Sequence, residues 1–409
     1  MSETIEAESE ANEPPLFPMK RTCPFHPPAE YAELRAEKPI SKVKLAVSGK
    51  VFWIVTRQEH VRQVLTAGNM SSNFKNPAYP LQVPVPEEAL QAMELPLVAM
   101  DPPEHTVRRH AIVPELTMKR MQALRPRIQE IVDEHVDAML EQGGPLDLVQ
   151  ALAVPVPSLI FCELMGVPKP DIPSFRSFAE TTVKSDVPPD EFAVAMQQME
   201  QYLDKLVAGK EENPTDDLLG RVIQRGSETG DLGHNDFVAL ARNLIFGGFD
   251  TVANMISLGV ALLLEHPEQL AELKADATLL PGAIEEMLRF LSIADSATAR
   301  AVTEDFELDG VLIRAGEGII ALNGSANRDD QVFENPDSFD IHREIPLHSA
   351  FGHGIHQCPG ANLVRIELDI VFRTLFERVP GLRLAVPVDE IPFKEMTLIQ
   401  GLKELPVTW

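Results

Sequence analysis

The chain has 409 residues, of which 44% are hydrophobic, enough to build a large core. Its 36 lysines and arginines stand against 62 aspartates and glutamates, and the resulting formal net charge of −26 argues against nucleic acid and anionic membranes as partners. Three widely separated cysteines (Cys23, Cys162 and Cys358) are typical of a reducing compartment rather than of a disulfide framework. The acidic N-terminus resembles neither a signal nor a transit peptide, and no apolar run reaches the ~18 residues of a membrane span, so we expect a cytoplasmic protein.

The first quarter of the chain combines short helices and strands. Residues 1–18 are acidic and contain proline, which predicts a mobile tail. Residues 70–97 are rich in Asn, Pro and Ser and predict a long irregular connection, a type of segment that often forms a lid. The regular elements predicted around it are helices at 29–37, 59–67 and 87–93 and a hairpin of strands at 42–47 and 51–55.

The middle of the chain is predicted to be helical. One helix begins at Asp101, which we expect to be its N-cap, and others span 120–142, 145–166, 172–186, 189–212 and 235–265. The last of these would be roughly 45 Å long. Its centre reads Gly247-Gly248-Phe249-Asp250-Thr251, where two glycines cost about 1 kcal/mol each relative to alanine. The Thr251 hydroxyl can bond the carbonyl of Gly247 and bend the helix. A packing kink and a groove for dioxygen beside an acid–alcohol pair are both compatible with this pattern.

The last third of the chain mixes a helix with short strands. The helix at 283–291 carries Glu286 and Arg289, and a pair at this spacing is usually a weak surface salt bridge. Asp309-Gly310 predicts a tight turn between strands at 305–308 and 311–314, and further short strands are predicted at 382–385 and 405–409. We therefore expect a mainly α protein with small β patches, folded as one domain over residues 19–409.

Cys358 lies in a glycine-rich loop directly before a predicted helix. Free backbone N–H groups at a helix start favour a thiolate, and glycines allow a large flat group to approach the backbone. Two alternatives remain: a buried structural cysteine, and a zinc site formed with His353 and His356. A structural zinc site normally has four ligands in two pairs, and no second pair is visible.

The loop resembles the F-G-x-G-x-H-x-C-x-G haem-binding loop of the cytochromes P-450, most closely that of the soluble actinobacterial type. Residues 351–360 match every fixed position of this loop, as Phe351-Gly352-His353-Gly354-Ile355-His356-Gln357-Cys358-Pro359-Gly360. Other segments are similar to further motifs of the family: Asp101-Pro102-Pro103-Glu104-His105 with Arg109 to the haem-propionate helix, Gly247 to Thr251 to the oxygen-activation motif, and Glu286 with Arg289 to the E-x-x-R motif.

This resemblance implies a helix-rich triangular prism with a small β subdomain, a long central distal helix and a proximal cysteine loop. It implies haem b (iron protoporphyrin IX) with Cys358 as the axial thiolate ligand of the iron. Asp250 and Thr251 would deliver protons. Glu286 and Arg289 would form a structural network with Arg343. The implied cofactor-binding residues are His105, Arg109, Arg300, Phe351, His356, Cys358 and Gly360.

The implied activity is that of a haem-thiolate monooxygenase, which inserts one oxygen atom of O2 into a C–H bond of a hydrophobic small molecule. A steroid, a polyketide such as a macrolide, or a xenobiotic is the expected substrate class. Positions in the family pattern suggest the substrate-pocket residues Val98, Asn243, Phe246, Gly247, Ile293, Ser296 and Ile399. Two alternatives are a peroxide-driven peroxygenase, whose members replace the Asp–Thr pair, and a non-catalytic haem sensor or carrier, which predicts a closed distal side.

The electrons must come from another protein because the chain has no dinucleotide or flavin motif. The resemblance implies a ferredoxin and an NAD(P)H-dependent ferredoxin reductase, acting on a monomer. We expect the ferredoxin to dock on the face behind Cys358, where Arg108, His353 and Arg365 would supply positive charge.

Overall fold

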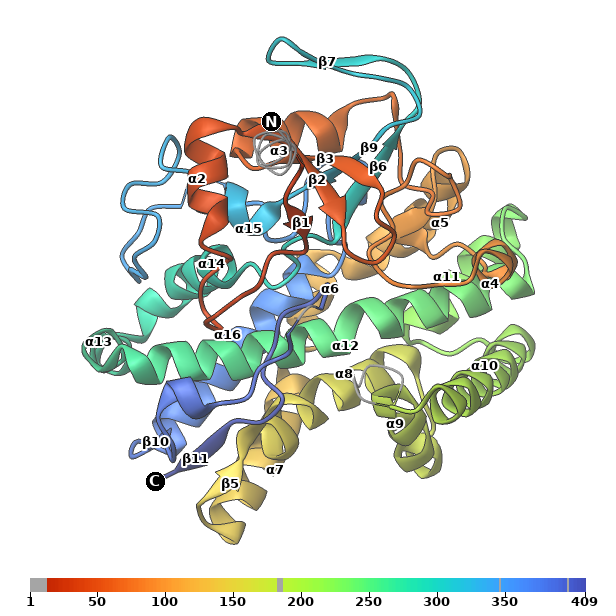
Figure 1. Cartoon of the computed structure of the whole chain (residues 1–409). Coiled ribbons are helices and arrows are strands. Elements are labelled where there is room, and N and C mark those ends of the chain that lie inside the picture. Colours follow the sequence, from red (N-terminus) through yellow and green to blue (C-terminus); the bar gives the residue numbers. More distant parts are fainter. Residues whose placement is uncertain (1–12, 182–186, 346, 396) are drawn as a thin grey trace.

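The computed structural model describes residues 13–181, 187–345, 347–395 and 397–409. The start of the predicted tail and the predicted helix end at 182–186 lie outside these ranges. Helices dominate the fold, and the long helix α12 (His234–Glu265) crosses the middle of the molecule (Figure 1). The six-stranded sheet lies on one side of α12 and the helices α7 to α10 lie on the other (Figure 1).

Apart from the short strand β4, which lies in the predicted irregular connection, the N-terminal elements follow the predicted order, with boundaries that differ by no more than two residues. They are α2 (Glu30–Glu37), β2 (Ile40–Leu45), β3 (Val51–Val55), α3 (Gln58–Thr66), β4 (Met70–Ser71) and α4 (Glu87–Ala92). One difference concerns the tail. Strand β1 (Leu16–Phe17) pairs in parallel with β2 and the Phe17 side chain is fully buried, so the inner end of the predicted tail belongs to the sheet.

Two of the predicted central helices are interrupted, and in both cases a proline lies in the first turn of the next helix. The segment 120–142 divides at Leu124 because Pro126 occupies the first turn of α7, where its missing N–H costs no hydrogen bond. The segment 145–166 divides into a strand, a π-helical turn and a helix that starts at Pro155. The resulting elements are α5 (Glu104–Ile112), α6 (Met118–Ala123), α7 (Arg125–Gln142), β5 (Leu146–Asp147), α8 (Pro155–Met165), α9 (Ile172–Thr181), α10 (Pro189–Glu212) and α11 (Leu218–Thr229).

The C-terminal part adds helices below the cysteine loop and two strands that the sequence pattern did not predict. Both strands, β6 (Thr298–Val302) and β9 (Gly318–Ala321), are almost entirely buried, so they lack the polar–apolar alternation that identifies a strand. The other elements are α13 (Pro267–Ala275), α14 (Leu280–Leu291), β7 (Phe306–Leu308), β8 (Val311–Ile313), α15 (Asn323–Ala326), α16 (Ala361–Arg378), β10 (Arg383–Leu384) and β11 (Pro406–Thr408).

The strands form three sheets. The largest has the order β1-β2-β3-β9-β6-β4, and a three-stranded sheet has the order β10-β11-β5. The hairpin of β7 and β8 turns at Asp309 and Gly310, whose φ angles of 48° and 76° are those of the tight turn predicted from this dipeptide.

Helix α12 is the centre of the core and packs against α8, α10 and α16. Its 32 residues span about 48 Å, and nearly all side chains of its C-terminal half are buried. By length and composition alone α12 could cross a membrane, but 72% of its most apolar window is buried inside the fold, as in the core helix of a globular protein. The same helix carries the Gly247–Thr251 motif past the start of α16, and the two helices therefore position the site.

Candidate active site

The cysteine loop folds back on itself immediately before α16. The Cys358 N–H donates to the Phe351 carbonyl at 2.9 Å, which closes the loop. Gly354 has a φ of +75°, and a Cβ at this position would lie 2.5 Å from the Leu65 carbonyl oxygen, so both conformation and space require glycine. The Arg365 guanidinium on α16 lies 4.7 Å from the centre of the Phe351 ring and covers it.

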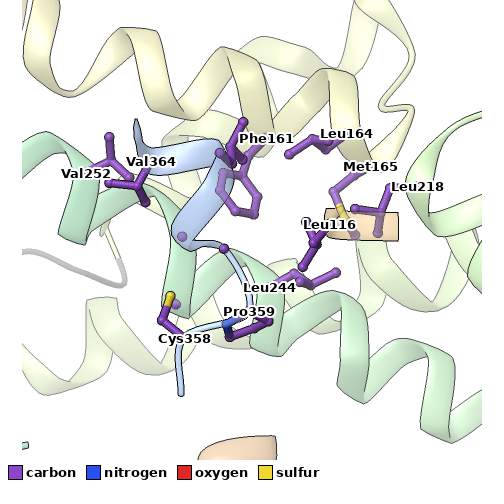
Figure 2. A pocket seen from close by; sticks show the side chains of 14 residues that line it. Leu116, Phe161, Leu164, Met165, Leu218, Leu244, Val252, Cys358, Pro359 and Val364 are labelled. Carbon is purple, nitrogen blue, oxygen red and sulfur yellow. The ribbon is translucent and has the colours of Figure 1, made fainter. Parts of the chain in front are cut away.

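Cys358 lines an apolar cavity that lies between the cysteine loop and α12 (Figure 2). In Figure 2, Cys358 and Pro359 lie at one side of this cavity, opposite Phe161 on α8. The remaining lining comes from Leu116, Leu164, Met165, Leu218, Leu244, Gly247, Gly248, Val252, Gly360, Leu363 and Val364. Cys358 and the glycine pair of α12 thus line one cavity, and the rest of its lining is apolar.

The two glycines of α12 have different surroundings. A Cβ on Gly248 would lie 1.7 Å from Cζ of Phe161, whereas a Cβ on Gly247 would have no heavy atom within 4 Å. Gly248 therefore lets α8 pack directly on the helix backbone, and Gly247 leaves open space. The Thr251 hydroxyl donates to the Gly247 carbonyl at 3.0 Å, the bond expected from the sequence.

Both oxygen atoms of the Asp250 carboxylate have partners. Oδ1 lies 3.0 Å from Nζ of Lys394, and Oδ2 accepts a hydrogen bond from Asn254 at 3.1 Å. Asp250 and Thr251 do not line the apolar cavity; they lie on α12 between its lining residues Gly248 and Val252. No local sequence pattern predicts the role of Lys394, because this residue is separated from Asp250 by 144 residues.

Four side chains predicted to bind the cofactor form a cationic edge, in which His105 and Arg300 are buried and Arg109 and His356 are half-buried. The rings of His105 and His356 are 4.2 Å apart, and both His105 nitrogens are buried without a partner in the described part of the chain. Arg300 is buried, and its guanidinium donates a hydrogen bond to the Ala299 carbonyl at 2.7 Å. Arg109 donates to the Gln357 carbonyl, and no salt bridge between described residues includes Arg109 or Arg300. Buried donors without acceptors indicate a site for a carboxylate.

Burial keeps the histidines of this edge neutral. Burial, followed by the positive charge of Arg300, lowers the pKa of His356 to about 3, and burial with the charge of Arg109 lowers the pKa of His105. A bound anion would reverse part of this effect, because a negative charge stabilises the protonated ring.

A hydrogen-bonded chain from β4 holds His356 in place. The Ser72 hydroxyl lies 3.0 Å from Nε2 of His356, and the Ser72 N–H donates to Asp101 at 2.7 Å. Asp101 also accepts from the Ser71 hydroxyl at 2.5 Å. The prediction that Asp101 caps α5 is therefore wrong: Pro103 occupies the N-cap position, and the Asp101 side chain binds β4 instead.

These residues fit haem. An apolar cavity beside a cysteine sulfur suits a flat hydrophobic macrocycle, and unpaired buried donors at one edge suit its two propionates. In the protein alone, burial raises the pKa of the Cys358 thiol, although the Gly360 N–H and the charge of Arg109 act in the opposite direction. Iron supplies the missing stabilisation, since a thiol that coordinates a metal is deprotonated. The described residues contain no group of three or more His, Cys, Asp or Glu suited to a metal ion, which disfavours the zinc alternative.

A buried ionic network supports the cysteine loop from below. Glu286 accepts two hydrogen bonds from Arg289, at 2.7 and 2.8 Å, and one from Arg343 at 3.1 Å. Arg289 also donates to the Asn327 carbonyl, and the Asn327 side chain accepts from the N–H of Ser349. The network thus reaches the loop two residues before Phe351.

The predicted substrate residues are dispersed. Gly247 lines the apolar cavity, whereas Val98 is 62% exposed on a short 3-10 helix and Ile293 is buried beside the C-terminal segment. Ser296 exchanges two hydrogen bonds with Gln82 of the long connection. Asn243, Phe246 and Ile399 likewise lie outside the lining of this cavity, and the assignment of all seven residues to the substrate stays a prediction.

The expected docking charges are largely neutralised, which corrects the prediction that they are available to a partner. The Arg108 guanidinium lies 2.5 Å from Asp236 at the start of α12, and Arg365 forms two hydrogen bonds with Glu285. Burial, with the nearby charge of Arg62, lowers the pKa of His353, so this ring also contributes little positive charge near neutral pH.

Comparisons with known proteins agree with this geometry. Residues 189–387 match the family model of cytochrome P-450. Pentalenic acid synthase of Streptomyces avermitilis is 46% identical over 97% of this chain and 98% of its own length, and vitamin D3 dihydroxylase of Streptomyces griseolus is 42% identical over 97% of each protein. The crystal structure of cytochrome P-450 MoxA from Nonomuraea recticatena superposes with a TM-score of 0.91 at 47% identity, covering 96% of this chain and 98% of that one. The chain therefore belongs to the cytochrome P-450 family, with haem b bound through a cysteine thiolate, and it is a monooxygenase.

Proposed function

We propose that this enzyme hydroxylates a C–H bond of a bulky hydrophobic small molecule, with electrons from a ferredoxin and an NAD(P)H-dependent ferredoxin reductase. The observation that carries the proposal is that Cys358 and the glycine pair of α12 line the same apolar cavity. The names of the relatives, which refer to pentalenic acid and vitamin D3, support a terpenoid or steroid-like substrate. We further propose that the enzyme acts as a cytoplasmic monomer.

Haem supplies the binding and reductive activation of dioxygen, and the protein controls its position and its protons. His105, Arg109, Arg300 and His356 would hold the two propionates by charge-assisted hydrogen bonds. Phe351 and Gly360 would border the cofactor on the cysteine side. The apolar lining excludes water, which keeps competing reactions away from the substrate.

We assign proton delivery to Asp250 and Thr251. The Thr251 hydroxyl donates its hydrogen to the Gly247 carbonyl, so its lone pairs remain available to accept a hydrogen bond from the cavity side. Asp250 is the adjacent carboxylate and is only partly shielded from solvent, which suits a group that passes protons from outside to the hydroxyl.

The test is product analysis under 18O2 with NADPH, a plant ferredoxin and its reductase. The panel contains vitamin D3, a macrolide and a sesquiterpene carboxylic acid. A monooxygenase transfers one labelled oxygen atom to the product and reduces the other to water with two electrons and two protons. Labelled product from at least one compound is expected. Product formed with hydrogen peroxide alone, and none with the reductase system, would instead establish a peroxygenase.

A further inference from the structure

Lys394 belongs to a C-terminal segment, residues 392–395 and 397–403, that lies against the middle of α12. Its N–H donates to the Gly401 carbonyl at 2.8 Å, and Phe393 and Leu402 form an isolated antiparallel bridge. The segment is also tied to the core, because the Gln400 N–H donates to the Ile293 carbonyl at 2.8 Å. Backbone hydrogen bonds, within the segment and to the core, therefore hold the part of the chain that carries Lys394 in place.

The segment lies close to α12 beside Asp250, the carboxylate that is proposed to deliver protons. A Cβ on Gly401 would lie 2.0 Å from the side-chain oxygen of Asn254, so the backbone of the segment packs directly against that side chain. Asn254 and Lys394 each bind a different oxygen of Asp250, at 3.1 and 3.0 Å. The carboxylate is therefore fixed from two directions, once by its own helix and once by the C-terminal segment.

The ion pair is better shielded than an ordinary surface pair. The side chains of Lys394 and Asp250 are 15% and 19% exposed, whereas fully solvated pairs contribute little because water screens them and their side chains remain mobile. A shielded pair with a second hydrogen bond on the same carboxylate fixes its orientation. Such orientation matters in catalysis, because small displacements of a reacting group reduce rates strongly.

We propose that Lys394 is a positioning residue that orients the Asp250 carboxylate for proton delivery. The inference rests on the proposed function of Asp250 and names the partner on which that function depends. Lys394 itself is not among the residues that line the cavity. It acts through Asp250 in the way that orienting partners hold a metal ligand, where removing the partner reduces function by roughly 10- to 100-fold.

The reaction without added substrate provides a direct assay, because it divides between two products according to proton supply. Two electrons and two protons convert O2 into hydrogen peroxide, whereas four electrons and four protons convert it into two waters. We expect Lys394→Gln to raise the ratio of peroxide to water by roughly tenfold, the lower end of the effect of losing an orienting partner. Lys394→Arg, which keeps the charge, should restore most of the wild-type ratio. Lys42→Gln is the matched control, since Lys42 lies on β2 in an ion pair with Glu317 at 3.2 Å.

Two further measurements separate positioning from a general structural role. The carbon monoxide difference spectrum of Lys394→Gln should equal that of the wild type, which shows that the haem site is intact. Hydrogen exchange of the Lys394 and Lys403 amides should be faster in Lys394→Gln and normal in Lys394→Arg, because both amides bond within the segment that the ion pair holds. This readout requires no turnover.

The double variant Asp250→Asn/Lys394→Gln distinguishes a role of Lys394 through Asp250 from an independent role. If Lys394 acts through Asp250, the double variant should resemble Asp250→Asn alone. A wild-type peroxide ratio in Asp250→Asn would refute the proton role of Asp250. A strong effect of Asp250→Asn together with a wild-type ratio in Lys394→Gln would overturn the role of Lys394 alone, and additive losses in the double variant would also contradict it.

Discussion

The glycine pair of α12 allows a sharp test of how the site is packed. A methyl group on Gly248 would lie 1.7 Å from Cζ and 2.1 Å from Cε2 of Phe161, whereas carbon atoms in ordinary contact are about 3.5–4.0 Å apart. The Phe161 ring must therefore move by about 2 Å. Such overpacking costs about 1–3 kcal/mol, and the higher helix propensity of alanine recovers about 1 kcal/mol. We expect Gly248→Ala to lower the free energy of unfolding by up to about 2 kcal/mol.

Gly247→Ala is the matched control, because the added methyl group meets no heavy atom within 4 Å. It should be neutral or stabilise the protein by up to about 1 kcal/mol. Urea denaturation of the haem-loaded variants measures both effects, and haem content reports whether the displaced ring enters the cavity. Phe161→Leu should relieve the strain when combined with Gly248→Ala. Equal stability of the two alanine variants would refute the packing of Phe161 on α12.

Three further changes test the surroundings of the site. Glu286→Gln leaves the buried Arg289 without its carboxylate and should cost about 3–5 kcal/mol in urea denaturation. Burial raises the pKa of Glu285, but hydrogen bonds from Arg365 and His348 outweigh this effect and lower the pKa to about 2. Glu285→Gln should therefore destabilise the protein at neutral pH. The stability contributed by this lowered pKa is present above the unfolded value of 4.5 and is lost as the pH falls towards about 2, so the two unfolding curves should converge over that window. His105→Ala should release haem faster to apomyoglobin, because it removes a donor from the cationic edge.

Each of these expectations has a result that would contradict it. A loss below about 1 kcal/mol in Glu286→Gln would show that the network is unimportant for stability. A stability difference for Glu285→Gln that persists unchanged down to the lowest pH would contradict the ionic origin of the effect. Unchanged haem release in His105→Ala, compared with His110→Ala on the same helix α5, would contradict a propionate contact.

The cofactor loop and the central helix could be predicted because their signals are local. Gly354 is required by its own φ angle and by the nearby Leu65 carbonyl, and the Thr251–Gly247 bond joins two residues one helical turn apart. The hairpin turn at Asp309-Gly310 depends on two adjacent residues only. Such features are encoded within a few positions, so a sequence pattern identifies them.

The missed features depend on contacts between distant segments. Lys394 meets Asp250 across 144 positions, and Ser72 meets His356 across 284. Asp101 has the residue type of a helix cap but binds β4, because tertiary partners compete with local capping. The strands β6 and β9 are buried throughout and show no alternation. Charges expected to be free, such as that of Arg108, are paired by acidic residues of other helices.

The central claim is that Cys358 is the thiolate ligand of haem iron, and its most direct test is the absorption spectrum of the dithionite-reduced, carbon monoxide-bound protein. A thiolate ligand shifts the Soret band far to the red, and we expect this band in the wild type. The Cys358→Ala variant should lose the band even when it retains haem. A wild type without the shifted band, or a Cys358→Ala variant that keeps it, would contradict the assignment.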